Sequence, residues 1–444
     1  MNNNKNIKNK IAMKKITFRK SVLTICFLAF SFCASANDTI TFTWQAGTTN
    51  KTFTVLATSG ETFTVYWGDE TDDIYTGTGN LSVNPSHVYT AAGTYTVNIV
   101  ANSASCRFTY LFCSNTSIRS LNVSKSTALE TLYCNTNSLN SLDVSKNTAL
   151  RRLECAFNSI SSLNVSNNTV LAWLDCSSNP IGSLDVTNNT ALKELECFSN
   201  QLITLDLSKN TALEKLSCSN NSLSSLDVSK NTALTWLNCF SNVLSTLDLS
   251  NNRALTWLQC YNNRLSLSDL FVASETMNNQ FSKRLGTQNL IPQTVSTEET
   301  LFSEQSMFNG IYTDYTVTKN GNPAPTSDYT ISNGTIIFHN LGSYTITMTN
   351  NAIVSHTDYP AKVIADINVN NVNAIKAIQV ASIKIYPNPT TDLVNIGKQA
   401  DIKVYSLQGA LLQETFGEKV NLSAYAKGVY ILQVNDEKAK VVKK

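Results

Sequence analysis

The chain of 444 residues has only three histidines, and only 15% of its residues are charged. So few imidazoles leave the carboxylates as almost the sole groups that could act as a general base. The motifs GxSxG and HExxH are absent, as are a P-loop and a GxGxxG sequence that leads into a helix. These absences argue against an enzyme, and we expect no catalytic residue and no cofactor.

Metal-binding spacings are also missing. The cysteines form no CxxC pair, and none of them stands at a metal-ligand spacing from a histidine. We therefore expect no bound metal.

The apolar run Val22–Phe32 is too short to span a membrane permanently. It follows a basic segment, Lys5–Lys20, and precedes the small residues Ala34–Ala36, so we predict a signal peptide over residues 1–36. Removing its seven basic residues from the 34 in the chain leaves 27 against 32 acidic ones, a net charge of about −5. This acidic balance predicts that nucleic acid is not a partner.

What the sequence has in abundance is a repeat. One unit runs from Leu129 to Ala149 as LETLYCNTNSLNSLDVSKNTA, and the next begins at once with the same letters in the same positions. A fixed period of this length is typical of a solenoid, whose stacked coils bury faces that no coil could bury alone. Eight cysteines mark the 21-residue period: Cys113, Cys134, Cys155, Cys176, Cys197, Cys218, Cys239 and Cys260.

Each unit contains two short segments in which apolar and exposed positions alternate. Leu132 and Cys134 alternate with polar residues, and Leu142 and Val144 do the same, as half-buried strands require. The intervening residues are rich in Ser, Asn and Thr and carry no helical stripe. We predict a mainly β fold, a right-handed β-solenoid with a strand in each half of the coil, flanked by β-sandwich modules. Eight coils would stack over roughly 40 Å.

Two polar or weakly polar columns accompany the leucines. The asparagines at the Asn137 and Asn147 positions fall at turns, where we expect them to bond backbone groups and form a stacked amide ladder. The cysteines are interpreted as small buried hydrophobes. Disulfides between adjacent coils and metal coordination are the alternatives, and thiol titration of the unfolded chain separates them.

The pattern LxxLxCxxNxL, carried by Leu129, Leu132, Cys134, Asn137 and Leu139, resembles a bacterial leucine-rich repeat of the short kind. We assign it to residues 106–275. The resemblance implies a binding scaffold and names no ligand.

Residues 37–105 alternate threonine with apolar residues, which predicts strands. The segments Trp67–Asp69, His87–Tyr89 and Gly93–Tyr95 make this module similar to a PKD-type β-sandwich. The resemblance implies that these letters build the core and one tight turn, with His87 packed rather than acting as a base. We interpret the acids in Asp69–Asp73 as a solvated turn, with a weak calcium site as the alternative. Packed on the first coil, the module would cover the end of the solenoid.

After Leu265 the period breaks, and one short helix or an irregular cap is expected. Residues 276–369 read as an Ig-like β-sandwich with tight hairpin turns at Asn320-Gly321 and Asn333-Gly334. Residues 370–381 are predicted to be a linker.

The last segment, residues 382–444, carries a second set of motif residues: Tyr386, Pro387, Asn388, Pro389, Gly409, Gly428 and Tyr430. In this order they resemble the C-terminal sorting domain of the type IX secretion pathway of Bacteroidetes. The resemblance implies a small Greek-key-like sandwich, in which Gly428 begins a buried strand. It also implies the type IX secretion machinery as a partner, export across the outer membrane, and a location at the cell surface or in the extracellular space.

The outward positions of the two halves of the coil differ in how much they vary. In the second half they repeat Ser-x-Asp almost unchanged, whereas in the first half they vary widely and include three tryptophans. Aromatic residues and arginine are what binding hot spots use. We predict that the first-half surface is the recognition surface, and drift of the repeat without a function is the alternative. The predicted binding residues are Tyr133, Arg152, Trp173, Phe198, Trp236, Phe240, Trp257 and Tyr261.

These features together predict a secreted, surface-associated binding or adhesion protein that recognises an extracellular protein or polysaccharide. A structural spacer that displays other modules and an accessory protein of glycan degradation are the alternatives.

Deletion of Ile383–Lys444 should leave the protein in the periplasm, because the resemblance places the export signal there. Immunoblots of periplasmic, outer-membrane and medium fractions test this, with the full-length chain expressed in the same cells as the control. Normal export of the truncated chain would contradict the assignment.

Overall fold

The computed structural model describes residues 37–277, 282–370, 390–406, 410–434 and 437–444. The predicted signal peptide, almost all of the predicted linker, and the motif residues Tyr386–Pro389 and Gly409 lie outside these ranges. The chain divides into two compact units, the larger within residues 1–368 and the smaller made mainly of Val369–Lys444. No helix in the described part of the chain is long and apolar enough to cross a membrane.

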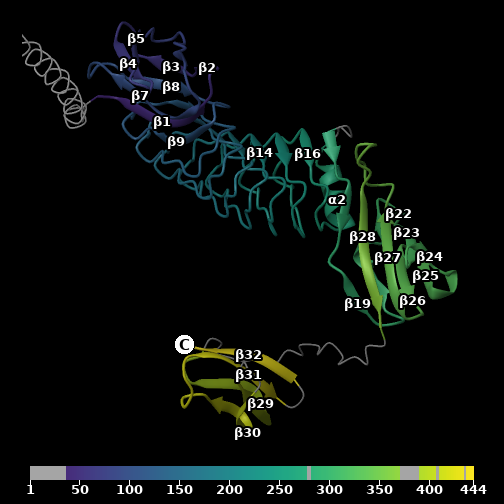
Figure 1. Ribbon diagram of the computed structural model, residues 1–444. Coiled ribbons are helices and arrows are strands. Elements are labelled where there is room, and N and C mark those ends of the chain that lie inside the picture. The colour runs from purple at the N-terminus through teal and green to yellow at the C-terminus, as the bar shows by residue number, and fades with distance from the viewer. Residues whose placement is uncertain (1–36, 278–281, 371–389, 407–409, 435–436) are drawn as a thin grey trace, which may run out of the picture. The chain divides into compact units, whose positions relative to one another are not determined.

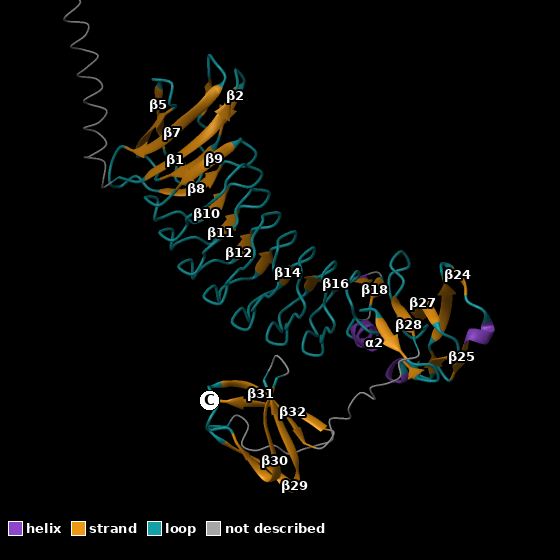
Figure 2. Cartoon of the chain, turned by 60° about the horizontal axis from the view of Figure 1, so that its bottom comes forward, coloured by secondary structure: helices purple, strands orange, loops and turns teal. Residues whose placement is uncertain are grey.

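The repeat folds into stacked coils, each with one short strand in a shared parallel sheet (Figures 1 and 2). Neighbouring strands pair in register, so that Leu132 lies opposite Leu153 and Leu153 opposite Leu174. The period of 21 residues therefore becomes one strand spacing of about 4.8 Å. The strands are β8 (Phe108–Phe112), β10 (Thr131–Tyr133), β11 (Arg152–Glu154), β12 (Trp173–Asp175), β13 (Glu194–Glu196), β14 (Lys215–Ser217), β15 (Trp236–Asn238), β16 (Trp257–Gln259) and β17 (Lys283–Arg284).

The core of the solenoid consists of columns of equivalent apolar side chains, identical from coil to coil at the Leu132 and Cys134 positions. Leu132, Cys134 and Val144 are 0% exposed, and so are their equivalents in the next coil, Leu153, Cys155 and Val165. Each buried leucine or valine stabilises the stack by about 1.5–3 kcal/mol. The predicted burial of both the leucine and the cysteine columns is confirmed.

The prediction of a strand in each half of the coil is wrong for most coils. A second-half strand forms only in the first coil, β9 (Ile118–Asn122), and between residues 123 and 264 the second halves are turns and irregular segments. The reason is that asparagine side chains there take the carbonyls that a strand ladder would use. Asn168 Nδ2 donates to Val144 O (3.0 Å) and to Asn147 O (2.8 Å), both in the preceding coil.

The first-half asparagines clamp consecutive coils through the backbone. Asn158 Nδ2 donates to Cys134 O of the preceding coil and to Cys155 O of its own, each at 3.0 Å. Its Oδ1 accepts the N–H of Leu139 at 3.0 Å. The predicted bonds from asparagine side chains to backbone groups are confirmed. The predicted stacked amide ladder is wrong in form, because each amide bonds backbone groups rather than the amide of the next coil.

Residues 37–105 form a β module that shares two sheets with the solenoid and holds a separate two-stranded sheet of β2 and β6. One sheet has the order β5-β4-β7-β1-β9, and in the other β3 pairs antiparallel with β8. The module thus covers the sheet edges that the first coil would otherwise expose. Its strands are β1 (Thr39–Ala46), β2 (Asn50–Thr52), β3 (Thr54–Ala57), β4 (Thr62–Tyr66), β5 (Asp72–Thr76), β6 (Ser86–Val88) and β7 (Gly93–Ala101).

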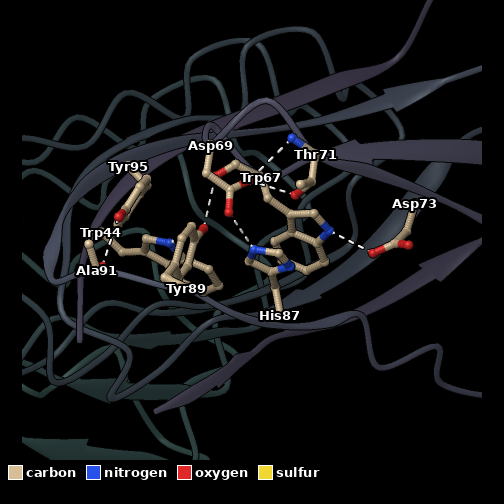
Figure 3. A network of polar contacts seen from close by, with 9 residues as sticks. All are labelled: Trp44, Trp67, Asp69, Thr71, Asp73, His87, Tyr89, Ala91 and Tyr95. Carbon is tan, nitrogen blue, oxygen red and sulfur yellow. Dashed lines mark hydrogen bonds and ion pairs between the residues drawn. The ribbon is translucent and has the colours of Figure 1, made fainter. Parts of the chain in front are cut away.

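A network around His87 fixes the turn of this module (Figure 3). His87 Nε2 lies 2.7 Å from Asp69 Oδ2, and its ring stacks on Trp67 at 5.0 Å. Trp67 Nε1 donates to Asp73 Oδ2 at 2.8 Å. Burial opposes the charge of Asp69, but hydrogen bonds from Thr71 and the contact with His87 outweigh burial and lower its pKa. His87 is packed, as predicted, and Asp69 and Asp73 each bond protein groups.

The other end of the solenoid is closed by helix α2 (Leu267–Glu275) and by strand β17. Ser266 and Asp269 form a capping box that starts the helix. At its other end, Lys283 Nζ binds the carbonyls of Ser274 (2.6 Å), in the last turn, and Met277 (2.8 Å), just beyond it. The buried side chain of Gln288 takes the place of the next asparagine clamp. Gln288 Oε1, which corresponds to Oδ1 of the clamp asparagines, accepts a hydrogen bond from Asn263 N at 3.1 Å. Gln288 Nε2 donates to Cys260 O at 3.0 Å.

A β module follows, with one sheet in the order β18-β28-β27-β23-β24 and a smaller one in the order β20-β26-β25. Both residues of Asn320-Gly321 and of Asn333-Gly334 have positive φ, which confirms the two predicted hairpin turns. The strands are β18 (Thr287–Asn289), β19 (Gln293–Val295), β20 (Thr300–Leu301), β21 (Met307–Phe308), β22 (Ile311–Tyr312), β23 (Asp314–Lys319), β24 (Asn322–Pro323), β25 (Tyr329–Ser332), β26 (Thr335–Phe338), β27 (Gly342–Thr349) and β28 (Lys362–Val369).

The smaller unit is an antiparallel sheet in the order β30-β29-β31-β32. Gly428 begins strand β31, as predicted, but the strand is half-buried rather than buried, with only Leu432 and Val434 fully covered. Tyr430 packs against Tyr425 at the edge of the core. Lys443 is buried, and its Nζ binds Leu422 O (2.8 Å) and Tyr425 O (2.7 Å), which holds the last strand in place. The strands are β29 (Leu393–Tyr405), β30 (Leu411–Asn421), β31 (Gly428–Val434) and β32 (Glu437–Lys443).

Replacing Asn179 by alanine should destabilise the solenoid more than replacing Asn189 by alanine. Both amides donate to two or more carbonyls, but Asn179 Oδ1 also accepts Ile160 N at 2.9 Å, whereas Asn189 Oδ1 is buried without a partner. An orphaned buried N–H costs about 1–3 kcal/mol, which is the expected difference in unfolding free energy from urea titrations. Equal losses in the two variants would contradict the clamp.

Candidate recognition surface on the solenoid

The outward side chains of the parallel strands form two columns, which together we call the strand face. They point outward because they flank the buried leucine of each three-residue strand. Because neighbouring strands pair in register, each outward residue lies beside the equivalent residue of the next coil. The first column is Tyr110, Thr131, Arg152, Trp173, Glu194, Lys215, Trp236 and Trp257, and the second is Phe112, Tyr133, Glu154, Asp175, Glu196, Ser217, Asn238, Gln259 and Arg284.

At one end of the strand face, Arg152 lies between two aromatic rings. Its guanidinium is 3.7 Å from the centroid of Trp173 and 5.2 Å from that of Tyr133. Glu154 Oε1 accepts from Arg152 Nε (2.9 Å) and Nη2 (2.5 Å). We call these four residues the Arg152 cluster, in which a stacked cation is already neutralised by a carboxylate.

Carboxylates crowd the middle of the strand face. Burial raises the pKa of Asp175, and the nearby charge of Glu154 adds to the rise. Burial also raises the pKa of Glu196, with further contributions from Asp175 and Glu194. Lys215 Nζ pairs with Glu194 at 3.0 Å. The stacked carboxylates therefore repel one another, as like charges on facing strand positions do.

The other end of the strand face is neutral and aromatic apart from one cation. Phe240 and Tyr261 follow the cysteines of their coils, and their rings stack at 4.6 Å and 7°. Tyr359 lies 5.1 Å from Tyr261. The Arg284 guanidinium lies 4.8 Å from the Trp257 centroid and 5.0 Å from that of Tyr359. We call these five residues the Arg284 cluster.

The structure thus divides the predicted binding residues between two places. Tyr133, Arg152 and Trp173 meet at one end, and Phe240, Trp257 and Tyr261 meet at the other, with Trp236 next to Trp257 in the sheet. Phe198 has no ring contact with either group in the described part of the chain. The three tryptophans are half-buried rather than exposed as expected. Arginine side chains stack on two of them, Arg152 on Trp173 and Arg284 on Trp257.

Arg284 and Tyr359 belong to the surface but were not predicted from the sequence. Arg284 pairs with Gln259 after an insertion that contains helix α2, so it falls out of the 21-residue period. Tyr359 comes from the module after the solenoid. A periodic pattern cannot indicate either residue, because their position depends on how the end of the solenoid is closed.

The cysteine column contributes no reactive group to this surface. All nine cysteines in the described ranges are free and buried. Burial raises the pKa of Cys134 and of Cys218 to about 12, so their thiols stay protonated and unreactive at neutral pH. No group of three or more His, Cys, Asp or Glu side chains among the described residues is arranged to hold a metal.

The 21-residue repeat, the single parallel strand per coil and the asparagine clamps define a leucine-rich-repeat solenoid. Residues 384–444 match the family model of the secretion system C-terminal sorting domain. The protein is therefore exported by the type IX pathway to the outer membrane surface or the extracellular space. The PKD-type resemblance of residues 37–105 stays a prediction.

No curated protein matches the chain. Among solved structures, it is similar to the functional domain of InlJ from Listeria monocytogenes, which includes a cysteine ladder (25% identity, 59% of this chain, 62% of that one, TM-score 0.43). It is also similar to an internalin, InlF, from the same organism (26% identity, 38% of this chain, 49% of that one, TM-score 0.32). The chain thus spans less than two thirds of the length of either structure.

Two aspartates should respond oppositely to replacement by asparagine. Asp175 and Asp143 each accept a backbone N–H two residues ahead, at 3.0 and 2.9 Å, but burial raises the pKa of Asp175 whereas hydrogen bonds from Ser145 lower that of Asp143. A carboxyl group whose pKa is raised by folding contributes stability at low pH, and this contribution is lost as the pH rises through the folded-state pKa. A carboxyl group whose pKa is lowered by folding contributes stability at high pH, and this contribution is lost as the pH falls through the folded-state pKa.

At pH 7, Asp175→Asn should therefore raise the free energy of unfolding and Asp143→Asn should lower it. Both differences should shrink as the pH falls from about 7 toward about 3 in urea titrations. Changes of the same sign in the two variants would show that the two environments do not differ as described.

Proposed function

We propose that this exported protein is a binding or adhesion protein that uses the strand face to recognise an extracellular protein or polysaccharide. The observation that carries the proposal is the contrast between the two sides of the same coils. On the strand face, aromatic and arginine side chains gather into two clusters. On the second-half side, the outward aspartates serve their own turns, as Asp185 does by accepting Thr187 N at 2.9 Å.

This contrast follows from what each side must do. The second-half aspartates and asparagines satisfy backbone groups in every coil, so their identity is constrained by the fold. The strands satisfy their own backbone through the parallel ladder, so the outward positions of the strand face are free to vary. Half-buried aromatic residues and arginine in such positions are the residue types that dominate binding energy at interfaces.

Two alternative functions, a structural spacer and an accessory protein of glycan degradation, can be distinguished from this proposal. A spacer that only displays other modules would need no aromatic clusters on its surface. An accessory protein of glycan degradation would bind polysaccharide through the same clusters and would differ in what it accompanies. We propose no catalytic role, because the strand face presents no activated nucleophile and the thiols are buried.

Replacing Trp236 and Trp257 by alanine should weaken binding to the ligand found on arrays of extracellular-matrix proteins and polysaccharides probed with the mature chain. Loss of one hot-spot residue costs about 2 kcal/mol or more, so affinity should fall by roughly thirtyfold or more even if only one of the two tryptophans is a hot spot. The control replaces Lys209 and Lys230, which are exposed on the second-half side, by alanine. Undiminished binding by the tryptophan variant would remove the strand face from the function, and no binding on any array would favour a spacer.

A further inference from the structure

Asp38 carries a buried carboxylate oxygen that has no hydrogen-bond partner among the described residues. The residue is only 1% exposed. Its Oδ2 accepts a hydrogen bond from Phe108 N at 2.9 Å, whereas its Oδ1 is buried and accepts none. The hydroxyl group of Ser126 lies nearby, but it donates to Thr39 O at 3.3 Å. A buried carboxylate oxygen without a donor lowers the stability of the fold, so a further donor is needed to complete this site.

No ion pair in the described part of the chain involves Asp38. Burial raises its pKa, and the hydrogen-bonding groups around it, together with the positive charge of Arg107, offset this rise only in part. The side chain of Arg107 is exposed to solvent, where its charge is screened. Burial raises the pKa of the Cys106 thiol to about 11, so this neighbour is uncharged at neutral pH, and Glu61 adds further negative charge. The surroundings of Asp38 therefore favour one more cation.

Asp38 lies at the joint between the N-terminal module and the first coil. Phe108 begins β8, which pairs with β3 of the module on one side and with β10 of the solenoid on the other. Ala101, at the end of β7, donates its N–H to Asp38 O at 2.9 Å, and its carbonyl accepts from Asn37 Nδ2 at 2.9 Å. These two bonds hold Asn37 in place one residue before the buried carboxylate.

The sequence predicts that the signal peptide is removed after Ala36, which makes Asn37 the first residue of the exported chain. Hydrolysis of the Ala36–Asn37 peptide bond consumes one water molecule, leaves a carboxylate on Ala36 and turns the nitrogen of Asn37 into an α-ammonium group. We propose that this ammonium group binds Oδ1 of Asp38 as its counter-ion and completes the joint between the N-terminal module and the first coil.

The precursor and the processed chain should therefore differ in stability. Before cleavage the nitrogen of Asn37 belongs to an uncharged amide, so the Asp38 carboxylate is buried without a counter-ion. After cleavage the two groups form a charge-assisted hydrogen bond in a buried site, where such bonds are strong. Removal of the signal peptide thus strengthens the N-terminal cap of the solenoid. This effect depends on the predicted cleavage site and not on what the strand face binds.

Three forms of the mature chain, residues 37–444, test the proposal in urea titrations at pH 7. One has a free amino group on Asn37, one has that group acetylated, and one has Gly-Ser-Gly placed before Asn37. The free form should have an unfolding equilibrium constant about tenfold smaller than either blocked form, as expected for a charge-assisted hydrogen bond. Asp38→Asn should remove most of this difference, because the amide that replaces the carboxylate carries no charge.

The difference between the free and blocked forms should also depend on pH. Pairing with a carboxylate raises the pKa of an amino group above its ordinary value of about 7.7–8.0, so the extra stability should be present at about pH 7 and lost as the pH rises through the raised pKa. It should also be lost in acid, as Asp38 gains a proton. Glu61 and Cys106 are the same in all three forms, so their titration cancels in the comparison. This measurement needs no variant, so it decides the question even where Asp38→Asn does not fold.

Arg107→Gln is the matched control, because it removes the other positive charge near Asp38 and should leave the difference between free and blocked forms intact. Loss of the difference in that variant would assign the counter-charge to Arg107 and overturn the proposal. Equal stability of the free and blocked forms, or an undiminished difference in the Asp38→Asn variant, would also overturn it. So would N-terminal sequencing of the exported chain that finds a first residue other than Asn37.

Discussion

The structure depends on the register of its coils, and the asparagine clamps hold that register. Each first-half asparagine bonds carbonyls of its own and the preceding coil and accepts an N–H from the preceding one, so a shift of one residue would break all of these bonds. Because the coils cannot slip, leucine stacks on leucine and cysteine on cysteine along the whole solenoid. Burial of the apolar columns supplies most of the favourable free energy of folding. The clamps select the in-register stacking of the coils, because any other register leaves their polar groups without hydrogen bonds.

The same constraint separates the two sides of the coil. Where side chains complete the backbone hydrogen bonds, as the asparagines and aspartates of the second half do, the sequence is nearly constant. Where the parallel ladder completes them, the outward side chains are released for other purposes. The aromatic and charged clusters lie on the released side, and the sorting domain brings that side to the extracellular environment in which a ligand would be met.

The first and last coils of the solenoid each have one face with no neighbouring coil, and a flanking module covers that face at each end. The N-terminal module lends strands to both sides of the first coil. At the other end, Gln288 reproduces the hydrogen bonds of an asparagine clamp with a side chain that arrives from outside the repeat. The segments that cap this end also place Arg284 and Tyr359 beside the strand face. The same structural elements therefore close the solenoid and complete the aromatic cluster.

The sequence by itself determined the solenoid, its period, its buried columns and the sorting domain, because a repeat imposes the same local choice many times over. It also indicated the variable face, since alternation around Leu132 and its equivalents fixes which side chains point outward. Only the tertiary structure decided that the second half of the coil is held by asparagines rather than by strands, because the two use the same carbonyls. It also decided how the predicted binding residues group and that Arg284 and Tyr359 join them, because these contacts connect segments whose spacing follows no period.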